Sequence, residues 1–159
     1  MIAPDETSVD VERGLADAGA GLLLDVVDRM ARGPVVETPQ DDARATSAPK
    51  LLKTESPIDW SLPARTIHNR ERGLQPWPIA STTIDGARSL IHRTAVSDVR
   101  TDARPGTVIE AGGDVLAVAA ADGVVLQILE IQPEGRRTMS VREFLSGRKL
   151  TPGMSLGPA

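Results

Sequence analysis

Two adjacent arginines, Arg136 and Arg137, follow Gly135 shortly after residues 124–132, which are expected to form a strand. The glycine predicts a turn, so both guanidinium groups are expected at the surface. Neighbouring arginines on an exposed turn can bind neighbouring phosphates, and such binding is electrostatic and weakens as salt rises. The alternative is a turn that is merely hydrated, and the residues alone leave both interpretations open.

Two other groups of residues could suggest catalysis, and the sequence argues against both. Residues 153–157 read GMSLG, which has the GxSxG spacing of a hydrolase nucleophile elbow. That motif needs a strand, a sharp turn, a helix and a later histidine, whereas His68 and His92 both precede it. Neither histidine has further ligands at metal-binding spacing, so no metal site is expected.

The composition predicts one small globular domain with aliphatic packing. The chain has 159 residues, of which 40% are apolar, 25% charged and only 2% aromatic. It contains no cysteine, which excludes disulfides and thiolate chemistry and agrees with a reducing compartment. Its apolar runs are too short for a membrane helix and its first residues are acidic, so we expect a cytoplasmic protein without a membrane partner.

Charge is distributed unevenly along the chain. Residues 1–60 carry 6 Lys and Arg against 12 Asp and Glu, a net charge of −6, whereas residues 61–159 carry 12 against 10, a net charge of +2. The second part therefore suits a polyanionic partner better than the first, although nucleic-acid-binding domains usually carry a stronger excess.

A long helix and a linker are expected first. Residues 5–33 combine a capping-box pattern at Thr7 and Asp10 with apolar residues every three or four positions. Interior glycines leave open the alternative of two shorter helices broken near Gly19. Residues 37–56 are polar and have no period, which predicts a linker.

A second helix is expected after the linker. Asp59 or Ser61 can cap it, and Gly73 can end it. Glu71 falls on the apolar face of this helix, a conflict that predicts either an arginine partner or a position at an exposed edge.

The remainder of the chain predicts an all-antiparallel sheet. Short β-branched segments alternate with hairpin dipeptides, with no helical pattern between them. Closure removes exposed strand edges, so a small closed or partly closed barrel is expected. The predicted fold class is mainly β with flanking helices: an OB-like antiparallel β-barrel preceded by a linker and an isolated amphipathic helix. Ser140 and Glu143 predict a last short helix that ends at Gly147. The expected strands are roughly residues 87–96, 107–111, 115–120 and 124–132, with turns at 85–86, 112–113 and 122–123.

Five blocks of the sequence, in order, resemble one family. PWP or IDW alone would be weak, but five blocks in the family's order are strong. The chain resembles the carboxy-terminal part of methionyl-tRNA formyltransferases. The blocks are residues 5–33, 39–60 (PQDDARATSAPKLLKTESPIDW), 70–80 (RERGLQPWPIA), 105–139 and 142–157.

The resemblance implies how the chain is divided into parts and what each part does. It implies that residues 1–38 are the last helix of a formyltransferase catalytic domain, residues 39–58 an interdomain linker, and residues 59–159 an OB-like domain that helps to bind initiator methionyl-tRNA. In the family, the catalytic domain transfers formyl from 10-formyltetrahydrofolate to the methionyl amine. Its Asn-x-His motif has no counterpart here, so we expect this chain to bind no cofactor and to be inactive alone.

The resemblance also indicates candidate tRNA contacts. Arg72 matches the family's arginine before the PWP turn, but it could instead pair with Glu71 or cap its helix. Trp60 and Trp77 could stack on bases, yet burial is favoured because so few aromatics are present to fill a core. The candidates are Lys50 and Lys53 in the linker, Arg72, and the pair Arg136 and Arg137.

Two other functions remain open on the sequence. The chain could be an inactive remnant or interaction module that associates with a separate catalytic domain, because an amphipathic first helix needs a surface to cover. It could also be the carboxy-terminal domain of a sugar-nucleotide formyltransferase, since a fold does not fix a substrate.

Overall fold

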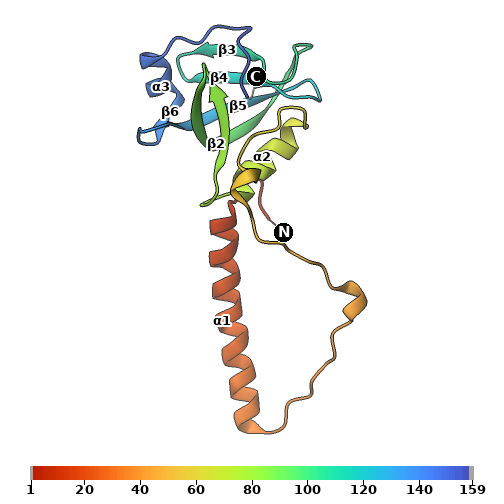
Figure 1. The fold of residues 1–159 in the computed structure, drawn as a ribbon. Helices are drawn as coiled ribbons and strands as arrows, with labels where there is room; N and C mark the ends of the chain where they lie inside the picture. The colour runs from red at the N-terminus through yellow and green to blue at the C-terminus, as the bar shows by residue number, and fades with distance from the viewer. Residues whose placement is uncertain (1, 158–159) are drawn as a thin grey trace. The chain divides into compact units, whose positions relative to one another are not determined.

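The computed structural model describes residues 2–157 and divides the chain into two compact units, Met1–Lys50 and Leu51–Ala159. The first unit is built on one long helix. The second is a six-stranded sheet accompanied by two shorter helices (Figure 1). Each unit is described by itself below.

Helix α1, Ser8–Arg32, is a single helix of 25 residues. The Thr7 Oγ accepts from the Asp10 N–H at 3.4 Å while the Asp10 carboxylate accepts from the Thr7 N–H at 3.0 Å, so the predicted capping box is confirmed. The helix continues unbroken through Gly19, so the alternative of two shorter helices is wrong. None of its residues is buried, and its leucines are exposed along with its polar side chains.

The rest of the first unit is extended chain. Between residues 34 and 50 the one regular element is a short 3₁₀ turn, η1, Asp42–Arg44. The Asp41 carboxylate accepts from the Ala43 N–H at 3.0 Å and so caps this turn. The polar, aperiodic sequence has therefore formed neither an α-helix nor a strand here.

The second unit is an antiparallel sheet with strand order β1-β2-β5-β4-β3, and β6 pairs with β5 (Figure 1). Three tight turns confirm the hairpin dipeptides: Asp85 and Gly86 have φ of 52° and 75°, and Gly113 and Gly123 have φ of 56° and 70°. The strands are β1 Ala80–Ile84, β2 Ala87–Arg100, β3 Val108–Gly112, β4 Val115–Ala119, β5 Val124–Pro133 and β6 Met139–Ser140.

The sheet is open between β1 and β3, so of the two expected forms the fully closed barrel is wrong. No strand ladder joins β1 to β3 within residues 2–157. Instead the last segment of the chain hydrogen-bonds to both edges: the Val108 N–H donates to the Met154 carbonyl at 2.7 Å, and the Gly157 N–H donates to the Thr83 carbonyl at 3.0 Å. Residues 56–58 also pair with β1: the Ser81 N–H donates to the Ser56 carbonyl and the Ile58 N–H donates to the Ser81 carbonyl, both at 2.7 Å. The two edges therefore find backbone partners without pairing to each other.

Strand β1 was not among the predicted strands. Its sequence, ASTTI, contains three hydroxyl residues, yet most of the strand is buried. Ser81 Oγ lies 2.9 Å from Ser56 Oγ, and the Trp60 indole N–H donates to Thr82 Oγ1 at 3.2 Å. A strand whose buried side chains are polar lacks the apolar alternation by which strands are recognised.

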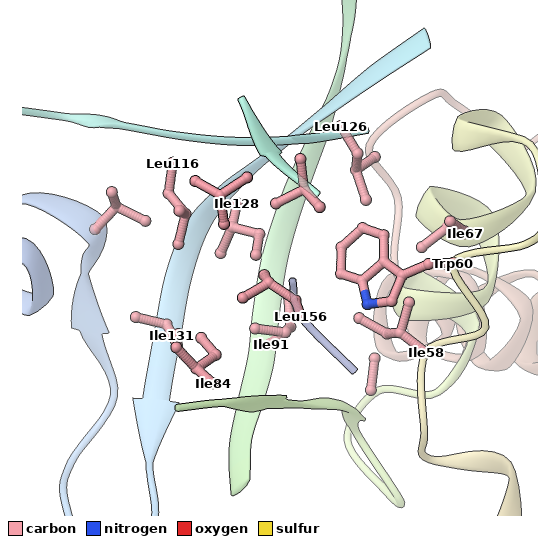
Figure 2. Packing of buried hydrophobic residues seen from close by; sticks show 14 of the residues in the cluster. Ile58, Trp60, Ile67, Ile84, Ile91, Leu116, Leu126, Ile128, Ile131 and Leu156 are labelled. Atoms are coloured by element: carbon pink, nitrogen blue, oxygen red, sulfur yellow. The ribbon is translucent and has the colours of Figure 1, made fainter. Parts of the chain in front are cut away.

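The core of the second unit is aliphatic, as the composition predicts, with one tryptophan at its edge. Trp60 is 6% exposed, and Figure 2 shows its ring directed into the cluster beside Ile58 and Ile67. Its ring also lies against the backbone at Gly106 and Gly157. Trp77 is 53% exposed, so the expectation that both tryptophans are buried is wrong for Trp77.

Helix α2, Ala64–Gly73, covers one part of this core. It follows Pro63 rather than a capping Asp59 or Ser61 side chain, while its end at Gly73 is as predicted. Glu71 on this helix is only 2% exposed, so an exposed edge does not resolve the conflict on the apolar face.

Hydrogen bonds from neighbouring side chains accommodate the buried Glu71. The carboxylate accepts from Thr94 Oγ1 and from Gln75 Nε2, both at 3.1 Å. Burial nevertheless raises the pKa of Glu71, and these two hydrogen bonds and the nearby Arg72 charge oppose that rise. His68 Nδ1 lies 2.9 Å from Thr94 Oγ1, so His68 belongs to the same buried polar group as Glu71 and Thr94.

Helix α3, Val141–Gly147, follows β6. The Ser140 and Glu143 side chains form the predicted capping box, and the helix buries Val141 and Phe144.

Candidate nucleic-acid interface

The two arginines that are adjacent in the turn after β5 have different surroundings. Gly135, with φ of 70°, lets the Arg136 N–H donate back to the Pro133 carbonyl at 3.0 Å. The Arg137 guanidinium then donates to Glu143 on α3 at 2.7 Å and to the Thr138 carbonyl at 3.1 Å. Arg136 is exposed, and its guanidinium makes no hydrogen bond or ion pair within residues 2–157. Arg136 is therefore available to a ligand in a way that Arg137 is not.

The ion pair between Arg137 and Glu143 keeps Glu143 ionised. Hydrogen bonding from Arg137 holds the pKa of Glu143 below its usual range, and the Ser140 N–H adds to the effect through the capping box. Glu143 is therefore ionised at neutral pH, and its charge is balanced by Arg137.

Arg72 takes part in the structure of α2. Its guanidinium donates to the Asn69 side-chain carbonyl at 2.7 Å, three residues earlier on the same helix. The residue is half-buried. Of the alternatives left by the sequence, this contact favours a structural role at the end of the helix.

The two lysines fall on either side of the division between the units. Lys50 ends the first unit, so its position relative to the other candidates is not defined. Lys53 begins a short 3₁₀ turn, η2, Lys53–Glu55, and is exposed. Ser56 directly after this turn accepts from the Arg88 guanidinium at 3.0 Å, which joins the chain after η2 to β2.

A chain of polar side chains links the end of α2 to the basic turn. Gln75 Nε2 donates to the His92 carbonyl at 3.1 Å, and His92 Nε2 lies 2.9 Å from Gln132 Oε1. Gln132 Nε2 in turn donates to the Arg136 carbonyl at 2.9 Å. The sequence predicts no role for His92 because it lacks metal ligands at suitable spacing, and the partners of its imidazole, Gln132 and Thr138, lie 40 and 46 residues away along the chain.

Two other arginines of the second unit are balanced by carboxylates. Arg93 lies 4.0 Å from Glu130, and Arg142 pairs with Asp114, which lowers the pKa of that carboxyl through the hydrogen bond. Paired, exposed arginines contribute less to the field that a polyanion meets. The positions of unpaired arginines therefore matter more than the net charge.

Residues 2–157 contain neither a metal-binding cluster nor a membrane-spanning helix. No group of three or more His, Asp or Glu side chains in residues 2–157 is arranged to hold a metal ion. Among the same residues no helix has both the length and the apolar character needed to cross a bilayer.

Comparison with known proteins identifies the family. A family model described as "Formyl transferase, C-terminal domain" matches residues 50–149. A methionyl-tRNA formyltransferase from Solibacter usitatus is 40% identical over 156 residues, which are 98% of this chain and 49% of that protein. One from Desulfotalea psychrophila is 39% identical over 148 residues, 93% of this chain and 46% of that protein. The chain belongs to the methionyl-tRNA formyltransferase family. It spans about half the length of the curated relatives it matches.

Solved structures confirm the fold of this family member. HypX from Aquifex aeolicus superposes with a TM-score of 0.67 at 16% identity, over 91% of this chain and 26% of that chain. A second HypX variant superposes with a TM-score of 0.65 at 18% identity, over 95% of this chain and 27% of that chain. At this identity the likeness concerns the fold alone.

Proposed function

We propose that this chain supplies the RNA-binding part of a methionyl-tRNA formyltransferase, with initiator methionyl-tRNA as its partner. In this proposal residues 59–159 are the OB-like tRNA-binding domain, opened between β1 and β3, residues 39–58 are the interdomain linker, and residues 1–38 are the last helix of the catalytic domain. The formyl donor, 10-formyltetrahydrofolate, is assigned to the part of the relatives that this chain does not cover.

The observation that carries the proposal is the position of Arg136. It lies on an exposed turn of a domain matched to the formyltransferase carboxy-terminal domain, and its guanidinium has no partner among the described residues. Lys53 is likewise exposed and makes no ion pair in that part of the chain. Unpaired cations at a surface bind phosphates with release of counterions from the RNA. No ion pair within the protein has to be broken first.

Binding of an initiator tRNA transcript at several salt concentrations tests the proposal. Two phosphate contacts predict that affinity falls roughly tenfold between 50 and 200 mM salt. Binding by the chain that is undetectable at 50 mM salt, or that does not weaken as salt rises, contradicts the proposal. Formylation of methionyl-tRNA by this chain alone would contradict the assignment of the chemistry to the other half of the relatives.

A second candidate function is association with a separate catalytic domain, and α1 favours it. Leu15, Leu22 and Leu24 are each about two-thirds exposed, which is unusual for so many leucines on one helix. Mixing this chain with the separately produced other half of the Solibacter usitatus relative should restore formyl transfer if α1 completes that domain. The Leu22→Asp variant should lose the restoration while retaining tRNA binding. Failure of the wild-type chain to restore formyl transfer would exclude this function, and equal restoration by variant and wild type would exclude the role of Leu22.

A further inference from the structure

The basic turn after β5 faces a hollow that the sequence does not reveal. The hollow has a volume of about 360 Å³ and lies between the end of β5 and α3. Arg136 borders it from the turn, and Arg148, just beyond α3, borders it from the helix. Met139 and Phe144 provide an apolar part of the lining, and Glu143 is its one acidic member.

Arg148 is held in place at this hollow. Its guanidinium lies over the Phe144 ring, 5.9 Å from the centroid, and one of its nitrogens lies 3.5 Å from the Ile84 carbonyl. A guanidinium has five N–H donors, so most remain for a ligand after these contacts. A planar, pre-positioned donor loses less entropy on binding a phosphate than a free lysine does.

The charge of the hollow depends on Arg137, although Arg137 does not line it. Glu143 is ionised, and its carboxylate is held at 2.7 Å by Arg137. Three arginines (Arg136, Arg137 and Arg148) against this one carboxylate leave a net charge of +2 beside the hollow. Without Arg137, an unbalanced carboxylate would repel any anion that enters.

We propose that Arg136 and Arg148 together bind a phosphodiester group of the RNA at this hollow, and that Arg137 is a positioning residue that balances Glu143. The inference rests on the proposed function, because RNA is taken as the source of the phosphate. It adds Arg148 to the binding residues and assigns different roles to the two adjacent arginines of the turn.

The first test compares single variants by fluorescence anisotropy with a labelled tRNA transcript. Arg136→Ala and Arg148→Gln should each weaken binding roughly three- to tenfold and reduce the slope of log affinity against log salt by about 1. Arg104→Ala removes the same charge from an exposed arginine that does not line the hollow, and should change affinity less than twofold. Circular dichroism of each variant checks that the fold is retained.

The outcomes separate the two proposals. A wild-type chain that binds no tRNA contradicts the proposed function itself. A wild-type chain that binds, with Arg148→Gln and Arg104→Ala equally affected or equally unaffected, overturns only the role of the hollow. Competition by inorganic phosphate at constant ionic strength should require millimolar concentrations, and displacement at micromolar concentrations would indicate a small-anion site and overturn the assignment to RNA.

The second test isolates Arg137. Arg137→Ala leaves Glu143 unbalanced and should weaken RNA binding, and adding Glu143→Gln restores the net charge of +2 and should restore the affinity. Glutamine keeps the capping function at this position of α3, so the double variant should fold normally. If the double variant binds as weakly as Arg137→Ala, then Arg137 contacts the RNA directly and the positioning role is wrong.

Discussion

Helix α1 and the sheet of the second unit contain the same kinds of aliphatic residue in opposite environments. Leu22 and Leu24 of α1 are each 67% exposed, whereas Leu116 and Leu126 of the sheet are fully buried. The sheet is therefore specified by packing between segments distant in the sequence. The helix is specified by signals within itself, chiefly its capping box and its apolar period.

This difference bears on what each region needs from a partner. A helix gains most of its stability from packing an amphipathic face, since propensity alone is marginal for isolated helices. The second unit already buries a large aliphatic core, and residues 56–58 and the carboxy-terminal segment hydrogen-bond to the edges of its sheet. We therefore expect substitutions in the two regions to change stability by different amounts, and in some cases in opposite directions.

The largest expected difference comes from truncating one large side chain in each region. Trp60→Ala should lower the free energy of unfolding of the second unit by about 3–5 kcal/mol, because it empties a packed position and leaves Thr82 without its donor. Leu22→Ala in α1 should change it by less than about 0.5 kcal/mol. Denaturant unfolding followed by circular dichroism measures both. If Leu22→Ala lowered the free energy of unfolding as much as Trp60→Ala, then α1 would be packed in the free protein, and the two regions would not differ as proposed.

A smaller contrast comes from placing alanine at a glycine in each region. Gly106 has φ of 81°, and a Cβ there would lie 2.9 Å from the Leu156 carbonyl oxygen, so Gly106→Ala should cost about 2 kcal/mol. Gly19 has open space around it, and Gly19→Ala should stabilise the helix by about 1 kcal/mol. Thermal unfolding reports the first and helical ellipticity at 222 nm the second. Changes of the same sign would show that α1 is not governed by its own propensity.

Local signals in the sequence were sufficient for most elements. The capping boxes at Thr7 and Ser140 and the glycine-containing hairpin turns are each encoded within four residues, and all occur as predicted. Strand β1 and the role of the carboxy-terminal segment were missed, because each depends on partners from another part of the chain. Closure of the sheet was predicted wrongly for the same reason.

The candidate site shows the same limit. Residue type and turn chemistry placed Arg136 and Arg137 together on a turn, and the turn is present. The partner of Arg137, six residues away on α3, and the place of Arg148 beside the same hollow follow only from the packing of α3. Sequence adjacency therefore suggested a pair of equivalent arginines, whereas the structure gives them different surroundings.

The buried Glu71 predicts a pH dependence confined to the second unit. Its pKa in the folded protein is raised above the reference value of 4.5, so it favours folding most below pH 4.5, and this contribution is lost as pH rises through the folded pKa. Glu71→Gln removes that loss, so the stability of the variant relative to wild type should increase from pH 4 to pH 7. The comparison of variant and wild type from pH 4 to 8 should show a difference that grows with pH. A constant difference would mean that Glu71 does not titrate in this range, and the helical signal of α1 should be unaffected throughout.

The smallest contrast concerns one hydroxyl in each region. Ser89 on β2 is fully buried, and its hydroxyl has no hydrogen-bond partner among the described residues, so Ser89→Ala should be neutral or stabilising by roughly 0.5 kcal/mol. Thr7 caps α1, and Thr7→Ala should instead destabilise the helix by about 0.5–1 kcal/mol, seen as a loss of ellipticity at 222 nm without a change in the unfolding of the sheet. A destabilising Ser89→Ala would indicate that a bound water satisfies the hydroxyl. In that case both hydroxyls would be hydrogen-bonded, and the two regions would differ only in whether water or protein supplies the partner.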